Sequence, residues 1–175
     1  MFSQLFEVNT VRIFKNMIVP LLMHTAEDLE EIEEDPRESV AHIEDICDEQ
    51  KSGSAKCWAA RLLGDLSEIV PGFISFAVNV SLYQLVEQKV EEETLQLQGY
   101  SKIQATEVAL VVLNVVSYHI KEHSKLRRAI DLTLERALPS LLYHEGQAVI
   151  IRQRAFHFCS LNLHQVFATL ADGGE

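Results

Sequence analysis

Glycine and proline are scarce in this sequence, with seven glycines and four prolines among 175 residues. Folds built from many short strands need frequent tight turns, which these two residue types provide, so their shortage argues against an all-β fold. It favours long regular elements instead. The three cysteines, Cys47, Cys57 and Cys159, form no C-x-x-C pair. That usage is typical of a protein from a reducing compartment, the cytosol or the nucleus.

Long apolar runs and an excess of basic residues are also lacking. The apolar run from Val108 to Val116 is far shorter than the roughly 18 residues of a membrane span. No charged and then apolar leader precedes a cleavage site, so no secretory signal is expected. Fifteen basic residues stand against 26 acidic ones, for a net charge of −11. A nucleic-acid binder needs a basic face, and we therefore expect neither a membrane nor a nucleic-acid partner.

The negative charge is concentrated in one acidic segment, residues 26–50. It holds twelve acidic residues and one basic residue, Arg37, so its net charge equals that of the whole chain. Such a block is either a solvated, self-repelling and poorly ordered stretch or an electrostatic docking element for a basic partner. The candidate partner-binding residues in its densest part are Glu27, Asp28, Glu30, Glu31, Glu33, Glu34 and Asp35.

Apolar residues recur at helical spacing along the chain, and no alternating strand pattern is present. The pattern predicts about seven helices, over residues 2–23, 36–50, 54–70, 73–97, 101–123, 124–143 and 147–170. Pro20 should kink the first helix or remove a hydrogen bond there. Ser54 and Ser101 are expected to cap the helices that follow them. The helix around 108–116 is apolar nearly all round, which predicts a central buried helix.

Two sequence features predict how these helices bury their apolar sides. The helix after Ser54 has an apolar stripe, formed by Trp58, Leu62, Leu63, Leu66, Ile69 and Val70. Within the acidic segment, Leu29 and Ile32 are expected on one side of a short helical turn, and Asp35 with Pro36 resembles a fresh helix start.

Helix–turn–helix units follow one another from Ser54 onward, for example Ser54 to Leu97 and Ser101 to Tyr143. Their length of roughly 45 residues is the period of HEAT or armadillo repeats. We therefore expect an all-α fold, an α-solenoid of HEAT-type antiparallel helix pairs. It would form one segment over 1–175, with an acidic insert over 26–53 between repeats. A closed helical bundle has similar helices and remains an alternative.

Few residues suggest chemistry. The stretch from His119 to His123 fits the H-x-x-E-H zinc-peptidase pattern, with two histidines one helical turn apart. A metal site there would need a third ligand from a distant element and a substrate cleft, and the stretch falls at a predicted helix C-terminus, where histidines are favoured anyway. No nucleophile elbow, P-loop or dinucleotide-binding motif is present. Cys57 and Cys159 resemble small core residues. We expect no enzymatic activity and no cofactor.

Two basic groups remain to be interpreted. Arg152 and Arg154 are expected to pair with acids of a neighbouring helix rather than to bind a ligand. Basic residues at the start of the helix after Ser124 belong either to a solvated face or to a concave binding surface. These are Lys125, Arg127 and Arg128.

Three stretches of the sequence carry further helix motifs. The first, FKNMIVPLLMHTAEDLEEIEEDPRESV, has a Pro-Leu-Leu helix end, an acidic segment and Asp-Pro-x-Glu. The second, SAKCWAARLLGDL, is an alanine-rich helix, and the third, ALPSLLYHEGQAVIIRQRAFHF, has Leu-Pro-x-Leu-Leu followed by an Arg-x-Arg-Ala run. In this order the three stretches resemble the importin-β (karyopherin-β) superfamily, nearest the branch of the importin-α exporter and the ribosomal-protein importers, where such an alanine-rich helix opens the next repeat.

The resemblance implies an internal segment of a longer solenoid in a nuclear transport receptor. Such receptors bind protein cargo and the GTP-bound small GTPase Ran, contact nucleoporins, and shuttle between nucleus and cytoplasm through the nuclear envelope. The acidic segment would contact basic cargo or Ran. An isolated fragment is expected to cover its apolar ends, Phe156, Leu163 and Phe167, by self-association or by repacking its helices. The alternative is a helical-repeat scaffold for protein–protein interaction, unrelated to transport.

Overall fold

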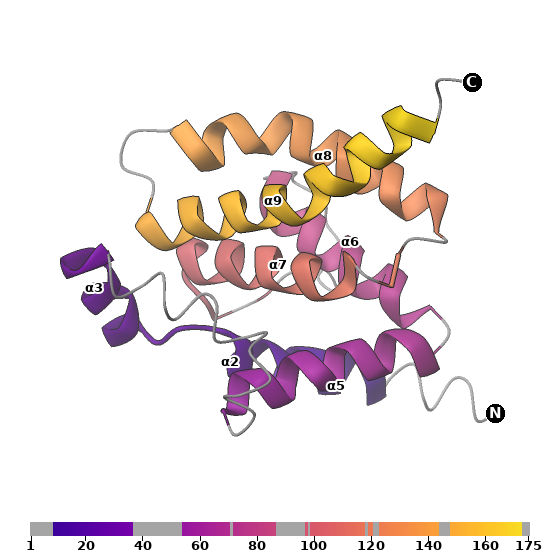
Figure 1. Cartoon of the computed structure of the whole chain (residues 1–175). Coiled ribbons are helices and arrows are strands. Elements are labelled where there is room, and N and C mark those ends of the chain that lie inside the picture. The colour runs from indigo at the N-terminus through magenta and orange to yellow at the C-terminus, as the bar shows by residue number, and fades with distance from the viewer. Residues whose placement is uncertain are drawn as a thin grey trace.

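The computed structural model describes residues 9–36, 54–70, 72–86, 97, 99–117, 119–120, 123–143 and 148–172 (Figure 1), with side chains left out at 134 and from 161 onward. These residues form helices and turns and include no strand. The predicted all-α class is therefore confirmed for this part of the chain. None of the helices here is both long and apolar enough to cross a membrane.

The elements follow the predicted order. They are η1 (Phe14–Ile18), α2 (Val19–Leu22), α3 (Ala26–Glu34), α5 (Ala55–Ile69), α6 (Phe73–Val86), α7 (Lys102–Ser117), α8 (Ser124–Tyr143) and α9 (Val149–Asp172). Both predicted serine caps are present, since the Ser54 hydroxyl accepts from the Cys57 N–H at 3.1 Å and the Ser101 hydroxyl from the Gln104 N–H at 3.3 Å. The predicted helix over 36–50 and the predicted extension of α6 beyond Val86 lie outside the described residues.

The first helix changes its winding at the predicted place. Pro20 has no N–H and stands in the first turn of α2. Immediately before it, η1 is a π-helical turn in which the Val19 N–H donates to the Phe14 carbonyl, five residues back. Because Pro20 cannot donate a backbone hydrogen bond, the regular helical bonding is interrupted there, and the wider π-helical turn accommodates the interruption. The result places Phe14 and Ile18 in the core.

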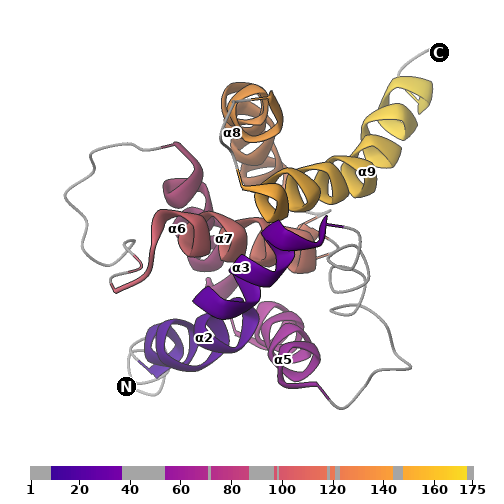
Figure 2. The ribbon, with the colours of Figure 1, turned by 90° about the vertical axis from the view of Figure 1, so that its left-hand side faces the viewer.

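The helices pack as three layers, which lie one above another in Figures 1 and 2. The short α2 packs against α5, α6 against α7, and α8 against α9. Between layers, α7 contacts both α5 and α9, and α6 contacts α8. The ring of Phe14 meets the rings of Phe73 and Phe76 edge-on, with centroids 6.0 and 5.5 Å apart. One apolar core thus runs through all three layers.

The prediction of a central helix that is buried on all sides is confirmed for α7. Nearly every side chain between Ala105 and Ser117 is buried. The helix ends six residues before the expected His123, in a turn where the His119 N–H donates to the Val116 carbonyl at 2.9 Å. Its neighbours are α6, α9, α5 and α2, and together these helices cover the sides of α7.

The predicted pairing of α7 with α8 is wrong. Chain order placed them in one unit, Ser101 to Tyr143, but the structure packs α7 along α6 and α9, and packs α8 along the same two helices. The sequence pattern shows which face of a helix is apolar and does not show which neighbour covers it. Because α7 is apolar on every side, its pattern allowed several partners.

The predicted apolar stripe of α5 is also partly wrong. Leu63 and Val70 are buried as expected, but Trp58 is 59% exposed and Ile69 is 73% exposed. Small side chains take the inner face instead, namely Cys57, Ala59 and Ala60. A Cβ atom at Gly64 would lie 3.3 Å from the His119 ring. The inner side of α5 therefore combines small residues with Leu63, and the close approach of the His119 ring leaves little room for a side chain at Gly64.

Candidate functional site

The first part of the acidic segment is a capped helix. Thr25 and Asp28 form reciprocal bonds, in which the Thr25 hydroxyl accepts from the Asp28 N–H at 3.1 Å and the Asp28 carboxylate accepts from the Thr25 N–H at 2.8 Å. These backbone and side-chain bonds hold the pKa of Asp28 below its usual value. Glu27 and Asp28 also stand in the first turn, where the helix dipole favours negative charge. Of the two interpretations of the acidic segment, a poorly ordered stretch and a docking element, the helix over 26–34 favours the second for this part of it.

Helix α3 contacts α9 near its C-terminal end. Ile32 is 4% exposed and Leu29 is half-buried against the core, which confirms that these two residues share the inner side. At the end of α3, the Glu33 carboxylate accepts from the Val149 N–H in the first turn of α9 at 2.6 Å. The Gln153 amide donates to the Pro36 carbonyl at 3.3 Å. Apolar burial and two cross-helix bonds thus fix the side of α3 that faces the body.

The remaining sides of α3 form an exposed acidic face. Its carboxylates all reach solvent, and they are Glu27, Glu30, Glu31, Glu33, Glu34 and Asp35. Asp28 is half-buried because it caps its own helix. Six of the seven predicted acidic site residues are therefore exposed. Glu27, Glu30, Glu31 and Glu34 lie on the outer sides of α3, Glu33 lies beside α9, and Asp35 lies at the C-cap.

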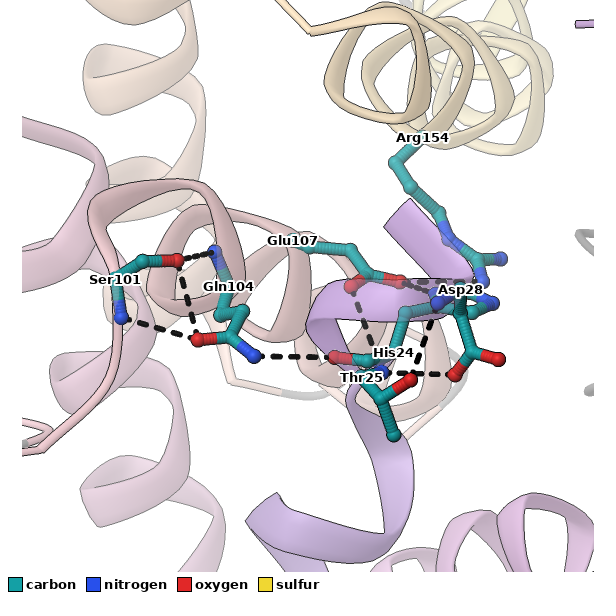
Figure 3. A network of polar contacts seen from close by, with 7 residues as sticks. All are labelled: His24, Thr25, Asp28, Ser101, Gln104, Glu107 and Arg154. Atoms are coloured by element: carbon teal, nitrogen blue, oxygen red, sulfur yellow. Dashed lines mark hydrogen bonds and ion pairs between the residues drawn. The ribbon is translucent and has the colours of Figure 1, made fainter. Parts of the chain in front are cut away.

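A buried ion-pair cluster lies beneath the start of α3, and Figure 3 shows its residues. Glu107, on α7, is 0% exposed. Its carboxylate oxygen Oε1 lies 2.5 Å from Nδ1 of His24, and its Oε2 accepts from the backbone N–H of His24 at 3.4 Å. His24 is buried as well and directly precedes the Thr25 cap. The acidic helix is thus joined at its start to the central helix.

Two more side chains complete this cluster. Arg154 of α9 is 2% exposed, and its Nη2 lies 3.6 Å from Glu107 Oε1. The prediction that Arg154 pairs with an acid of a neighbouring helix is confirmed, whereas Arg152 is exposed. Gln104, one turn before Glu107, donates from Nε2 to the His24 carbonyl at 3.2 Å. The cluster therefore links the chain before α3 with α7 and α9.

Charge balance keeps Glu107 ionised. Burial alone would raise the pKa of Glu107, but the hydrogen bond and charge of His24, with the charges of Arg154 and Lys56, outweigh it and hold that pKa below its ordinary value. Lys56, in the first turn of α5, has its pKa lowered by burial, against the attraction of Glu107 and Asp28. Glu107 is thus a buried carboxylate that interacts with three basic groups from different parts of the chain, and loss of any one of them would leave buried charge less well compensated.

The predicted basic site residues lie elsewhere. Lys125 and Arg128 are exposed in the first turns of α8, and Arg127 is half-buried. Figure 1 places α3 at the end of the molecule where α7 and α9 begin, and the first turn of α8 at the opposite end. The structure does not bring the acidic and basic candidates together into one surface.

The H-x-x-E-H stretch is not part of one helix in the described residues, because α7 ends at Ser117 and His123 directly precedes α8. His119 Nδ1 lies 3.1 Å from the Glu68 carboxylate on α5. The described part of the chain contains no group of three or more residues placed to hold a metal ion. Glu122 falls outside it.

Sequence reasoning missed the roles of His24, Gln104 and Glu107, although one signal was available. Glu107 is the single charged residue between Lys102 and Lys121, inside the helix that the apolar pattern marks as buried. An ionised group in such a place needs a buried partner of opposite charge. The position of Glu107 therefore predicts a basic partner, but it does not predict that the partner is His24, just before α3.

Comparison of the chain with protein-family models, with curated proteins and with solved structures finds no match.

Proposed function

We propose that this chain is a HEAT-type α-solenoid segment that acts by binding proteins. The layered packing supports this architecture. Helices α2, α6 and α8 follow one another on one side, α5, α7 and α9 on the other, and contacts run within each layer and between successive layers. Repeat arrays have this pattern, in which each helix pair contacts only its neighbours. On this interpretation the acidic insert interrupts the first pair, between α2 and α5, rather than separating two repeats.

The proposed binding element is the acidic face of α3, and the proposed partner is a basic protein surface. The observation that carries this proposal is that α3 is anchored on its apolar side while six carboxylates remain in solvent. A fixed row of like charges raises the local negative potential and speeds association with a basic partner. The basic residues of α8, Lys125, Arg127 and Arg128, would then belong to a separate surface.

The sequence resemblance adds a specific version of this function. In a nuclear transport receptor the partners would be basic cargo and GTP-bound Ran, with nucleoporins contacted by the full-length protein, and the protein would shuttle between nucleus and cytoplasm. The stretches that carry the resemblance coincide with η1 to α3, with α5, and with α8 to α9. The second candidate, a helical-repeat scaffold unrelated to transport, is favoured by the same packing without the resemblance.

Titration calorimetry with two probes separates these candidates. The probes are GTP-loaded Ran and a lysine–arginine peptide, each titrated into the protein at low ionic strength. Binding of both supports the transport receptor, and GDP-loaded Ran is the matched control that should not bind. Binding of the peptide alone supports the scaffold. If neither binds, the acidic face is a solvated surface and the proposed function fails.

We also propose that the isolated chain self-associates through exposed apolar side chains of its outer layers. Phe156, on α9, is 69% exposed, and Met17 and Leu21 are exposed on η1 and α2. The side chains of Leu163 and Phe167, expected to join Phe156, lie outside the described ones. Light scattering should show mass rising with concentration, and Phe156→Glu should reduce that rise. A wild-type chain that stays monomeric at high concentration contradicts this proposal.

A further inference from the structure

We propose that His24 is a positioning residue for the acidic face, because it fixes where helix α3 begins and how it is oriented. The three contacts of His24 with Glu107 and Gln104 form what we call the His24 clasp. The binding half of this inference rests on the proposed function, whereas its structural half does not.

The clasp holds one residue at three points. Glu107 Oε1 contacts the ring Nδ1, Glu107 Oε2 accepts from the backbone N–H, and the Gln104 amide donates to the backbone carbonyl. All three contacts come from one face of α7, whose backbone is buried in the centre of the fold. Holding the ring, the N–H and the carbonyl of one residue restricts both its position and its rotation. The next residue, Thr25, is the cap of α3, so this restriction is passed directly to the helix.

A second anchor lies at the other end of α3. Ile32 is buried and Glu33 accepts from the Val149 N–H of α9. Glu33 lies nine positions after His24, and the helical part of that stretch, from Ala26 to Glu33, is about 11 Å long. Two anchors at that separation fix the helix axis, and the burial of Ile32 fixes its rotation. Glu30, Glu31 and Glu34 then point away from the body.

The clasp matters for α3 because this helix has little stability of its own. Isolated helices shorter than about 12 residues are marginal in water, and neighbouring carboxylates repel one another along the helix. Without the clasp, the start of α3 would depend on the Thr25 cap alone. Part of the binding free energy would then be used to order the helix. Affinity for the partner would therefore fall without loss of any direct contact. His24, which is buried, would thus control binding without touching the partner.

The test uses His24→Ala, His24→Asn and, as a control, His123→Ala, whose side chain is exposed before α8. Asparagine places an amide N–H at about the position of Nδ1, so it retains the bond to Glu107. Amide hydrogen exchange is measured in α3, α6 and α8, and affinity is measured for the lysine–arginine peptide at low ionic strength. His24→Ala removes the ring contact with Glu107 and keeps the two backbone contacts. We expect it to speed exchange in α3 by roughly tenfold, as for loss of one buried hydrogen bond to a charged group.

Exchange in α3 should accelerate more than exchange in α6 and α8 in His24→Ala, because α3 loses its anchor directly while the other helices are affected only through the weakened cluster around Glu107, and peptide affinity should fall. His24→Asn should recover most of both properties, and the control should resemble wild type. The inference is overturned if α3 exchanges at the wild-type rate in His24→Ala, or if α3, α6 and α8 all accelerate equally, which would indicate general destabilisation. A wild-type protein that binds no peptide overturns the proposed function, and exchange in α3 still decides whether His24 positions the helix.

Discussion

Arg154 and Glu107 form an ion pair that is closed off from solvent, with side chains 2% and 0% exposed and with Nη2 and Oε1 3.6 Å apart. The two residues come from α9 and α7, in adjacent layers of the fold. Removing one member of such a pair leaves the other buried and uncompensated, which costs far more than the pair itself contributes.

Replacement of Glu107 by glutamine should therefore be strongly destabilising. The variant leaves the charges of Arg154 and Lys56 without their central counter-charge, and we expect a loss of about 3–5 kcal/mol in the free energy of unfolding. Urea denaturation measures it. The double variant Glu107→Gln/Arg154→Met should lose less than the sum of the two single variants, because the buried charge is also removed. Equal and additive small losses would show that the pair is not coupled.

Stability should also depend on pH through Glu107. Because the folded protein holds the pKa of this carboxyl below its ordinary value of 4.5, its contribution is complete above about pH 4.5. It is lost as the pH falls through the lower folded pKa. The difference in unfolding free energy between wild type and Glu107→Gln should shrink over that acid range. Other carboxylates titrate there in both proteins and cancel in the difference. A difference that stays constant from pH 7 downward would contradict this assignment.

Substitutions on the two faces of α5 should differ in how much stability they cost. Leu63 is fully buried, so Leu63→Ala should cost about 2–5 kcal/mol. Trp58 is largely exposed with the guanidinium of Arg61 5.6 Å from its ring centre, so Trp58→Ala should cost less than about 1 kcal/mol. Trp58 is the one tryptophan of the chain, and its emission should be accessible to acrylamide. A shielded tryptophan with a costly alanine variant would show that α5 is rotated from the described position.

The helices themselves were predictable because their signals are local. Ser54 and Ser101 cap their helices as expected, α8 spans Ser124–Tyr143 as predicted, and α7 is buried on all sides. Helix spacing and capping depend on residues three or four apart, which a sequence displays directly. The irregular turn before Pro20 belongs to the same class, because proline removes one identifiable bond.

Packing partners were less predictable, since they depend on contacts between distant residues. The stripe on α5 predicted Trp58 and Ile69 inside, but both are exposed, and Cys57, Ala59 and Ala60 are buried instead. The charge of the acidic segment alone left open whether it is a poorly ordered stretch or a docking element. The order of α3 comes from contacts of His24, Ile32 and Glu33. The polar partner of His24 lies 83 residues away in the sequence, and that of Glu33 lies 116 residues away.

The central claim is that the acidic face of α3 binds a basic partner, and the salt dependence of affinity tests it most directly. The variant Glu30→Gln/Glu31→Gln/Glu34→Gln removes three exposed charges and leaves Glu33, which contacts α9, in place. The matched control Asp65→Asn/Asp131→Asn/Glu135→Gln removes three exposed charges from α5 and α8. Affinity for the lysine–arginine peptide and for GTP-loaded Ran is measured at low and at physiological ionic strength, with helix content checked by circular dichroism.

The account predicts that the α3 variant loses roughly tenfold in affinity at low ionic strength, as three exposed ion pairs would. The loss should shrink at physiological ionic strength, where charges are screened over about 8 Å, and the control should bind like wild type. An α3 variant with the wild-type affinity and the wild-type salt dependence, or one no weaker than the control, would contradict the claim.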